Sequence, residues 1–148
     1  MTPQQLELVQ NSWEKVVPIA KDAAGLFYGR LFEVAPDVRK LFSDDIEEQG
    51  QKLMSVITTV VRGLKQFDRL EQTVWQLGRR HVGYGAVEAH YGVVAEVLLW
   101  TLQQGLGPAY NKDVEQAWQA ALGIVAGVMI DGANFEYANF EEYKARNQ

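Results

Sequence analysis

LEQTVWQLGRRH, residues 70–81, is the stretch that decides the kind of fold this chain adopts. Leu70, Val74 and Leu77 are apolar and lie four and three positions apart, and His81 continues the same stripe four positions later. This spacing is typical of one face of an amphipathic helix. A histidine on such a face has two interpretations. It is either a core residue whose ring nitrogens bond to the backbone, or a metal ligand that faces a cavity.

Helical spacing recurs through the rest of the chain, whereas no run of strict alternation and no Asn-Gly pair indicates a β-hairpin. Thr2, Pro3 and Gln5 predict a capped helix start, and Pro18 and Pro36 predict the ends of the first two helices. The apolar spacing predicts further helices at 36–42, 46–64, 70–81, 91–106 and 114–131. We therefore expect an all-α domain of six to seven helices with short connections.

The segment 46–64 is the longest amphipathic pattern before the histidine. We expect its buried face to consist of Leu53, Val56, Ile57, Val60 and Leu64. From Gln49, steps of 4, 7 and 11 along a helix reach only apolar residues, whereas the same steps from Gln51 reach Ser55, Thr58 and Arg62. A helix that buries one face therefore turns Gln49 inward and Gln51 towards solvent.

Composition limits the chemistry that the chain can support. The 148 residues suit one domain, and the absence of cysteine excludes disulfides, zinc–thiolate sites and cysteine-held iron–sulfur clusters. The net charge of 14 − 19 = −5 argues against a nucleic-acid partner. The N-terminus lacks a signal-peptide pattern, and the most apolar stretch, 93–99, is too short to span a bilayer. We expect a cytoplasmic protein with no membrane partner.

Only two histidines, His81 and His90, are available for imidazole chemistry. No histidine, cysteine or carboxylate lies three or four residues after His81, which argues against a zinc site with several protein ligands. A single ligand that faces a cavity suits haem, because the porphyrin supplies the other four nitrogens. For His90 we expect helix capping, surface exposure or a contact with a haem propionate.

Several motifs stand in a fixed order along the chain. Phe42 follows Pro36 by six residues, and Tyr28 precedes Phe42 by fourteen. The segment 77–81 ends in the histidine, and Tyr91 follows it by ten. In this order and at these spacings the chain resembles a globin, and within that family the bacterial single-domain globins and the haem domain of flavohaemoglobins.

The resemblance implies a globin fold for residues 1–132, with residues 133–148 as a C-terminal extension of the same domain. It implies haem b as the cofactor, with His81 as the axial iron ligand and a hydrogen bond from its other ring nitrogen to a carbonyl such as that of Leu77. The resemblance and the spacing together place further haem contacts at Phe42, Lys52, Val56, Leu77, Arg80, Val87 and Tyr91. The alternative for Lys52 and Arg80 is a solvated cation, and for Tyr91 a core tyrosine.

On the opposite, distal side we expect Tyr28, Gln49 and Leu53. Only seven residues separate Phe42 from Gln49, so we expect a short corner without the extra helix that most globins carry there. Tyrosine and glutamine both donate hydrogen bonds, which favours a ligand with partial negative charge and predicts tight oxygen binding with slow release. Because Gln49 is not a histidine, we do not expect the bis-histidine coordination of neuroglobins.

The function that the resemblance implies is reversible oxygen binding, for storage, scavenging or transport, with NO and CO as further diatomic ligands. Three alternatives remain: a nitric-oxide dioxygenase that uses an external reductase, a haem-based gas sensor, and a haemless interaction module. Flavohaemoglobins carry a glutamate where this chain has Ala133, and 148 residues leave no room for a reductase, so we favour binding over catalysis. We expect a monomer or a weak homodimer, with the aromatic tail at 134–148 either packed on its own domain or used for self-association.

Overall fold

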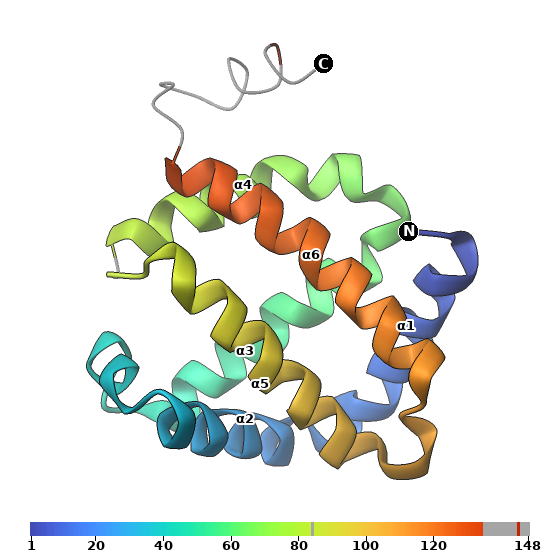
Figure 1. The fold of residues 1–148 in the computed structure, drawn as a ribbon, viewed down its shortest axis with the longest axis horizontal. Helices are drawn as coiled ribbons and strands as arrows, with labels where there is room; N and C mark the ends of the chain where they lie inside the picture. The colour runs from blue at the N-terminus through green and yellow to red at the C-terminus, as the bar shows by residue number, and fades with distance from the viewer. Residues whose placement is uncertain (84, 135–144, 146–148) are drawn as a thin grey trace.

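Six α-helices form the part of the chain that the computed structural model describes, which comprises residues 1–83, 85–134 and 145 (Figure 1). They are α1 (Pro3–Val16), α2 (Ala20–Val34), α3 (Ile46–Arg62), α4 (Phe67–Gly83), α5 (Glu88–Leu106) and α6 (Lys112–Asn134). Short 3₁₀ helices lie in the connections at Val17–Ile19, Pro36–Leu41, Leu64–Gln66 and Gly107–Ala109. No strand occurs among the described residues, and the all-α prediction is confirmed. The tail beyond Asn134 lies outside the described residues, apart from position 145.

The helix ends follow the local signals in the sequence. The Thr2 hydroxyl accepts a hydrogen bond from the backbone N–H of Gln5, and the Gln5 side chain accepts one from the N–H of Thr2, each at 3.0 Å. This reciprocal pair confirms the predicted capping box. Helix α2 ends at Val34, just before Pro36, and α5 ends where Gly107 adopts a φ of +54°.

Helix α1 crosses α6 through a pair of buried tryptophans. The rings of Trp13 and Trp118 are 5.8 Å apart between centroids, and both side chains are almost completely buried. The indole N–H of Trp118 donates to the hydroxyl of Ser12 at 2.8 Å. A buried N–H is therefore satisfied, and the pair fixes the relative position of the two helices.

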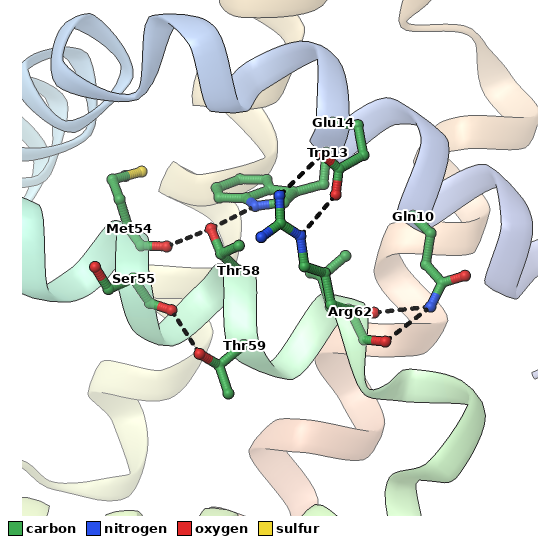
Figure 2. Close-up of polar contacts among 9 residues, drawn as sticks. Gln10, Trp13, Glu14, Met54, Ser55, Thr58, Thr59 and Arg62 are labelled. Carbon is green, nitrogen blue, oxygen red and sulfur yellow. Dashed lines mark hydrogen bonds and ion pairs between the residues drawn. The ribbon is translucent and has the colours of Figure 1, made fainter.

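Helix α3 is attached to α1 by side-chain contacts (Figure 2). The indole N–H of Trp13 donates to the hydroxyl of Thr58 at 2.9 Å, and that hydroxyl donates to the carbonyl oxygen of Met54 at 2.7 Å. Arg62 pairs with both carboxylate oxygens of Glu14, at 2.9 and 3.1 Å, and this arginine holds the pKa of Glu14 below its usual value. These contacts fix the C-terminal half of α3 against the N-terminal helix.

The buried face of α3 differs from the predicted one. The fully buried residues of this helix are Gly50, Met54 and Val61, whereas Val56 is 41% exposed. The predicted positions Leu53, Ile57 and Val60 are only half-buried, and Leu64 is buried just beyond the helix.

The prediction for this face is confirmed for Leu64, holds in part for Leu53, Ile57 and Val60, which pack half-buried against the core, and is wrong for Val56. Periodicity identifies an apolar face but not what covers it. The main neighbours of α3 are α1 and α2. Gly50 lies against α2, where an added Cβ would come within 3.0 Å of the Ala24 Cβ. The helix thus turns its small residue towards α2, and the apolar face with Leu53 and Val56 is left partly open.

Helix α4 packs instead against α6, and the two backbones touch. An added Cβ at Gly78 would overlap the carbonyl group of Met129, and one at Gly132 would overlap the carbonyl of Trp75. Each helix therefore contributes a glycine at the point where the other helix approaches. This crossing holds the end of α4, which carries His81, close to α6.

Candidate functional site

The His81 ring is held in one orientation at the end of α4. Its Nδ1 atom lies 2.6 Å from the carbonyl oxygen of Leu77. Because a carbonyl oxygen can only accept, Nδ1 carries the hydrogen, and in the neutral ring the lone pair is on Nε2. The expected hydrogen bond to Leu77 is confirmed, and it is the arrangement that orients a metal-binding histidine.

The surroundings of His81 combine apolar surface with one unpartnered hydroxyl. The rings of His81 and Tyr91 are 6.4 Å apart between centroids. The Tyr91 hydroxyl is buried and has no hydrogen-bond partner among the residues that the structure describes, and burial raises the pKa of this phenol. Val82 and Val87, which follow the histidine in sequence, are 53% and 56% exposed. The exposed valines offer apolar surface close to the histidine in sequence, and the buried hydroxyl is an unsatisfied polar group that calls for an explanation.

Tyr28 and Phe42, which are far from His81 in sequence, lie together between α2 and the corner before α3. Their rings meet edge to face at 5.4 Å, and Tyr28 also stacks on Phe32 at 5.8 Å. The Tyr28 hydroxyl donates to the backbone carbonyl of Gln49 at 3.5 Å. Burial raises the pKa of Tyr28 to about 12, so this phenol stays protonated as a hydrogen-bond donor at any physiological pH.

The corner before α3 is short, as predicted, with only residues 42–45 between the 3₁₀ helix and α3. The backbone N–H of Ser43 donates to the Gln49 side-chain oxygen at 2.8 Å. The carboxylate of Asp45 caps α3 by accepting from the N–H of Glu48 at 3.0 Å. Gln49 is half-buried and Gln51 is exposed, which is the order expected from the helical steps.

The two basic residues expected near the cofactor edge lie in solvent. Lys52 is largely exposed and pairs with Glu48 at 3.5 Å, one helical turn earlier. Arg80 is also exposed. For Lys52 this geometry supports the solvated-cation alternative, although a long flexible side chain at an exposed position can change partners.

His90 caps a helix. Its Nδ1 accepts a hydrogen bond from the backbone N–H of Val87 at 3.1 Å, at the start of α5. Helix capping is one of the roles expected for His90. The two histidines of the chain therefore make different contacts. His81 is oriented by a carbonyl within its own helix, whereas His90 satisfies a helix terminus.

Two contributors to the site were absent from the sequence prediction. Ser43 acts through its backbone N–H, which carries no side-chain signal. Phe32 stacks on Tyr28, and its place four residues later in a helix could have identified the pair.

The residues present fit haem better than a bare metal ion. No group of three or more histidine, cysteine or acidic residues that could hold a metal occurs in the described ranges 1–83, 85–134 and 145. A single oriented imidazole needs a ligand that supplies the remaining donors, and the porphyrin does so. The unpartnered Tyr91 hydroxyl beside His81 and the open apolar face of α3 suit the polar edge and the apolar body of such a cofactor.

Comparison with known proteins identifies the family. Residues 25–129 match the family model for globins, so this chain belongs to the globin family, and the predicted globin fold is confirmed. Membership supports haem-based binding of a diatomic gas. Among the helices that can be described, none is long and apolar enough to cross a membrane.

Curated relatives match most of the chain. Neuroglobin of Danio rerio is 32% identical over 139 residues, which cover 84% of this chain and 87% of that protein. The anaerobic nitrite reductase AHB2 of Arabidopsis thaliana is 31% identical over 135 residues, covering 81% and 85%. The similarity thus extends to proteins of an animal and of a plant.

Solved structures share the fold at lower identity. An engineered carbene transferase derived from RmaNOD of Rhodothermus marinus matches with a TM-score of 0.81 and 23% identity, covering 100% of this chain and 99% of that one. A bacterial globin from Campylobacter jejuni matches with a TM-score of 0.79 and 21% identity, covering 99% and 100%. At these identities the likeness shows a common fold.

Proposed function

We propose that this globin holds haem b through His81 and reversibly binds dioxygen on the side of Tyr28 and Gln49. The observation that carries the proposal is the hydrogen bond between Nδ1 of His81 and the carbonyl of Leu77, which assigns the lone pair to Nε2. The haem iron would supply the coordination position for a diatomic gas. His81 would bind and orient the cofactor from one side.

The other residues proposed to contact the haem are either apolar or polar. Phe42, already packed against Tyr28, would stack on the porphyrin. Val56, Leu77 and Val87 would supply apolar contacts; the exposure of the two valines supports this assignment. The polar edge of the cofactor would be met by the side chains of Arg80 and Tyr91, and Lys52 would reach it only by leaving its ion pair with Glu48.

The distal residues favour a ligand that accepts hydrogen bonds. The raised pKa keeps the Tyr28 hydroxyl protonated, and the amide of Gln49 supplies further N–H groups. A hydrogen bond to a charged acceptor contributes about 1.5–3 kcal/mol, which is roughly a ten- to hundredfold slower ligand loss. Dioxygen gains from such donors, whereas carbon monoxide, a poor acceptor, gains little. High oxygen affinity suits storage or scavenging better than bulk transport.

An absorption spectrum of the purified protein tests the cofactor and its ligand together. We expect an intense Soret band that His81→Ala removes. His90→Ala is the matched control, because His90 caps α5 and should leave the band unchanged. A wild-type protein without a Soret band after incubation with haem would support the haemless interaction module instead. Equal bands in both variants would refute His81 as the ligand.

Nitric-oxide dioxygenation with an external reductase is the second candidate. Its support is that the Rhodothermus marinus structure carries the name of a nitric oxide dioxygenase. The two candidates differ in turnover. A reversible binder consumes nitric oxide in a single stoichiometric burst, whereas an enzyme continues to consume it when reductase and NADH are added.

A further inference from the structure

We propose that the backbone N–H of Ser43 is a positioning group that determines which end of the Gln49 amide faces the ligand pocket. This inference rests on the proposed function. The Ser43 nitrogen lies 2.8 Å from the Gln49 side-chain oxygen. Because a backbone N–H can only donate, the atom that meets it is the amide oxygen, and the NH₂ group forms the other end of the side chain.

The donor is itself held in place by neighbouring groups of the corner. The Ser43 hydroxyl donates to the carbonyl of Asp45 at 3.2 Å, and the Arg39 guanidinium donates to the Ser43 carbonyl at 3.1 Å. Asp45 in turn caps α3 through the N–H of Glu48. Three contacts therefore fix the peptide groups around the Ser43 N–H. Without the bond to this N–H, the side-chain amide of Gln49 could rotate and exchange the places of its oxygen and its NH₂ group.

Gln49 is thereby constrained at two oxygens. Its side-chain oxygen accepts from Ser43, and its backbone oxygen accepts from Tyr28 at 3.5 Å. What remains for a ligand is the amide NH₂, which can only donate. The Tyr28 hydroxyl has a single proton, which points at the Gln49 carbonyl over a long contact of 3.5 Å, and it serves a ligand only by leaving that contact. The corner thus presents the donor end of the Gln49 amide. It favours a ligand that accumulates negative charge, such as dioxygen, over carbon monoxide. An amide released from Ser43 can turn its oxygen to the ligand and lose this preference.

A substitution at position 43 tests the N–H directly. Ser43→Pro deletes the N–H and keeps Gln49 unchanged. Phe42 already has φ −107° and ψ 156°, the extended conformation that a residue before proline prefers. Ser43→Ala is the matched control, because it keeps the N–H and removes only the hydroxyl contact with Asp45.

The measurement uses the full chain with its haem in the reduced, carbon-monoxide-bound form and follows the side-chain amide signals of Gln49 by NMR. We expect Ser43→Pro to shift and broaden these signals and to accelerate oxygen dissociation by about three- to tenfold, since a partial loss of one hydrogen bond to a charged acceptor is involved. Carbon monoxide dissociation should change less than about twofold. Ser43→Ala keeps the N–H and loses one of the contacts that hold it, so it should accelerate oxygen dissociation less than Ser43→Pro does.

Two outcomes would overturn the inference. In one, Ser43→Pro leaves the Gln49 signals and the oxygen rate at wild-type values. In the other, Ser43→Pro and Ser43→Ala change the rates equally, which would assign the effect to the rigidity of the corner and not to the N–H. The Gln49 amide signals of wild type and Ser43→Pro are also compared in the haem-free protein, so this inference can be tested even if the proposed function fails.

The wild-type protein supplies a second measurement if Ser43→Pro does not fold. Ser43 is exposed, so its amide hydrogen should exchange rapidly unless it is hydrogen-bonded. We expect slow exchange in wild type and faster exchange in Gln49→Ala, which removes the acceptor. Exchange of the wild-type amide at the rate of a free exposed amide would refute the bond.

Discussion

Helices α4 and α3 hold their site residues by different means. At α4 the backbone lies directly on α6, with Gly78 against the carbonyl of Met129 and Gly132 against that of Trp75. At the start of α3, by contrast, the site residue Gln49 is held by single hydrogen bonds from the Ser43 backbone and the Tyr28 hydroxyl.

The difference assigns a distinct task to each side of the site. Where two backbones touch, no side chain can move aside to change the spacing of the helices. The position and orientation of His81 on α4 therefore depend on how α4 packs against α6. Hydrogen bonds at an exposed corner contribute about 0.5–1.5 kcal/mol each and can be remade with water. We infer that the cofactor side is fixed by packing and that the ligand side is the part that single substitutions adjust.

The largest expected effect comes from adding a methyl group at the crossing of α4 and α6. Gly78→Ala places its Cβ into the carbonyl of Met129, so the helices must separate. We expect the free energy of unfolding to fall by about 3 kcal/mol, the upper end for overpacking, because the obstacle is backbone and not a flexible side chain. Chemical denaturation measures the change.

Gly127→Ala on α6 is the control for that variant. An added Cβ at Gly127 meets nothing within 4 Å, so only helix propensity changes, and we expect stabilisation by about 0.5–1 kcal/mol. If the two alanine variants had the same stability, the backbone contact between α4 and α6 would be excluded as the support of His81.

Parts of this arrangement were predictable from local rules. Pro36 and the capping pair at the first helix set helix ends, because they act through neighbours only a few residues away. The bond between His81 and Leu77 was predictable for the same reason, since both belong to one helical turn. Tyr28 and Phe42 were both predicted as site residues, one for the ligand and one for the cofactor, and the structure brings their rings together.

Other parts depend on which helices meet, and no local pattern contains that information. The open face of α3 with Val56 looks like a buried face in sequence, since apolar spacing is the same whether a helix or a cofactor covers it. Gly78 and Gly132 become partners only through the crossing of two distant helices. Ser43 contributes a backbone group, which every residue except proline possesses.

A second prediction concerns Tyr28, on the side of the site where the ligand is expected. Tyr28→Phe removes the hydroxyl and keeps the ring packed against Phe42. We expect oxygen dissociation to accelerate by at least several-fold and by up to about a hundredfold, since one bond to a charged acceptor is lost, while carbon monoxide dissociation changes little. Stopped-flow ligand replacement measures both rates. An unchanged oxygen off-rate would remove Tyr28 from the distal side.

The smallest expected effect concerns pH and compares Tyr28 with a tyrosine remote from the site. Burial raises the pKa of Tyr28 to about 12, and burial together with the nearby Glu115 carboxylate raises the pKa of Tyr110 to about 12. Both folded-state values exceed the ordinary tyrosine value near 10, so the folded protein holds these protons more tightly than the unfolded chain does. Their contribution to stability is complete below pH about 10 and is lost as the pH rises towards 12.

Single phenylalanine variants separate the two tyrosines. Chemical denaturation between pH 8 and pH 11.5 should give a free energy of unfolding that falls above pH about 10 in the wild type and falls less steeply in Tyr28→Phe or Tyr110→Phe.

Tyr110 also donates to Glu115 at 3.3 Å, so Tyr110→Phe should lower stability at pH 8 as well, by about 0.5–1.5 kcal/mol. Tyr28→Phe should cost less at pH 8, because its hydroxyl makes only a long contact of 3.5 Å with Gln49. If instead Tyr28→Phe proved the more destabilising variant at pH 8, the Tyr28 hydroxyl would be a structural bond of the corner and not a donor kept available for a ligand.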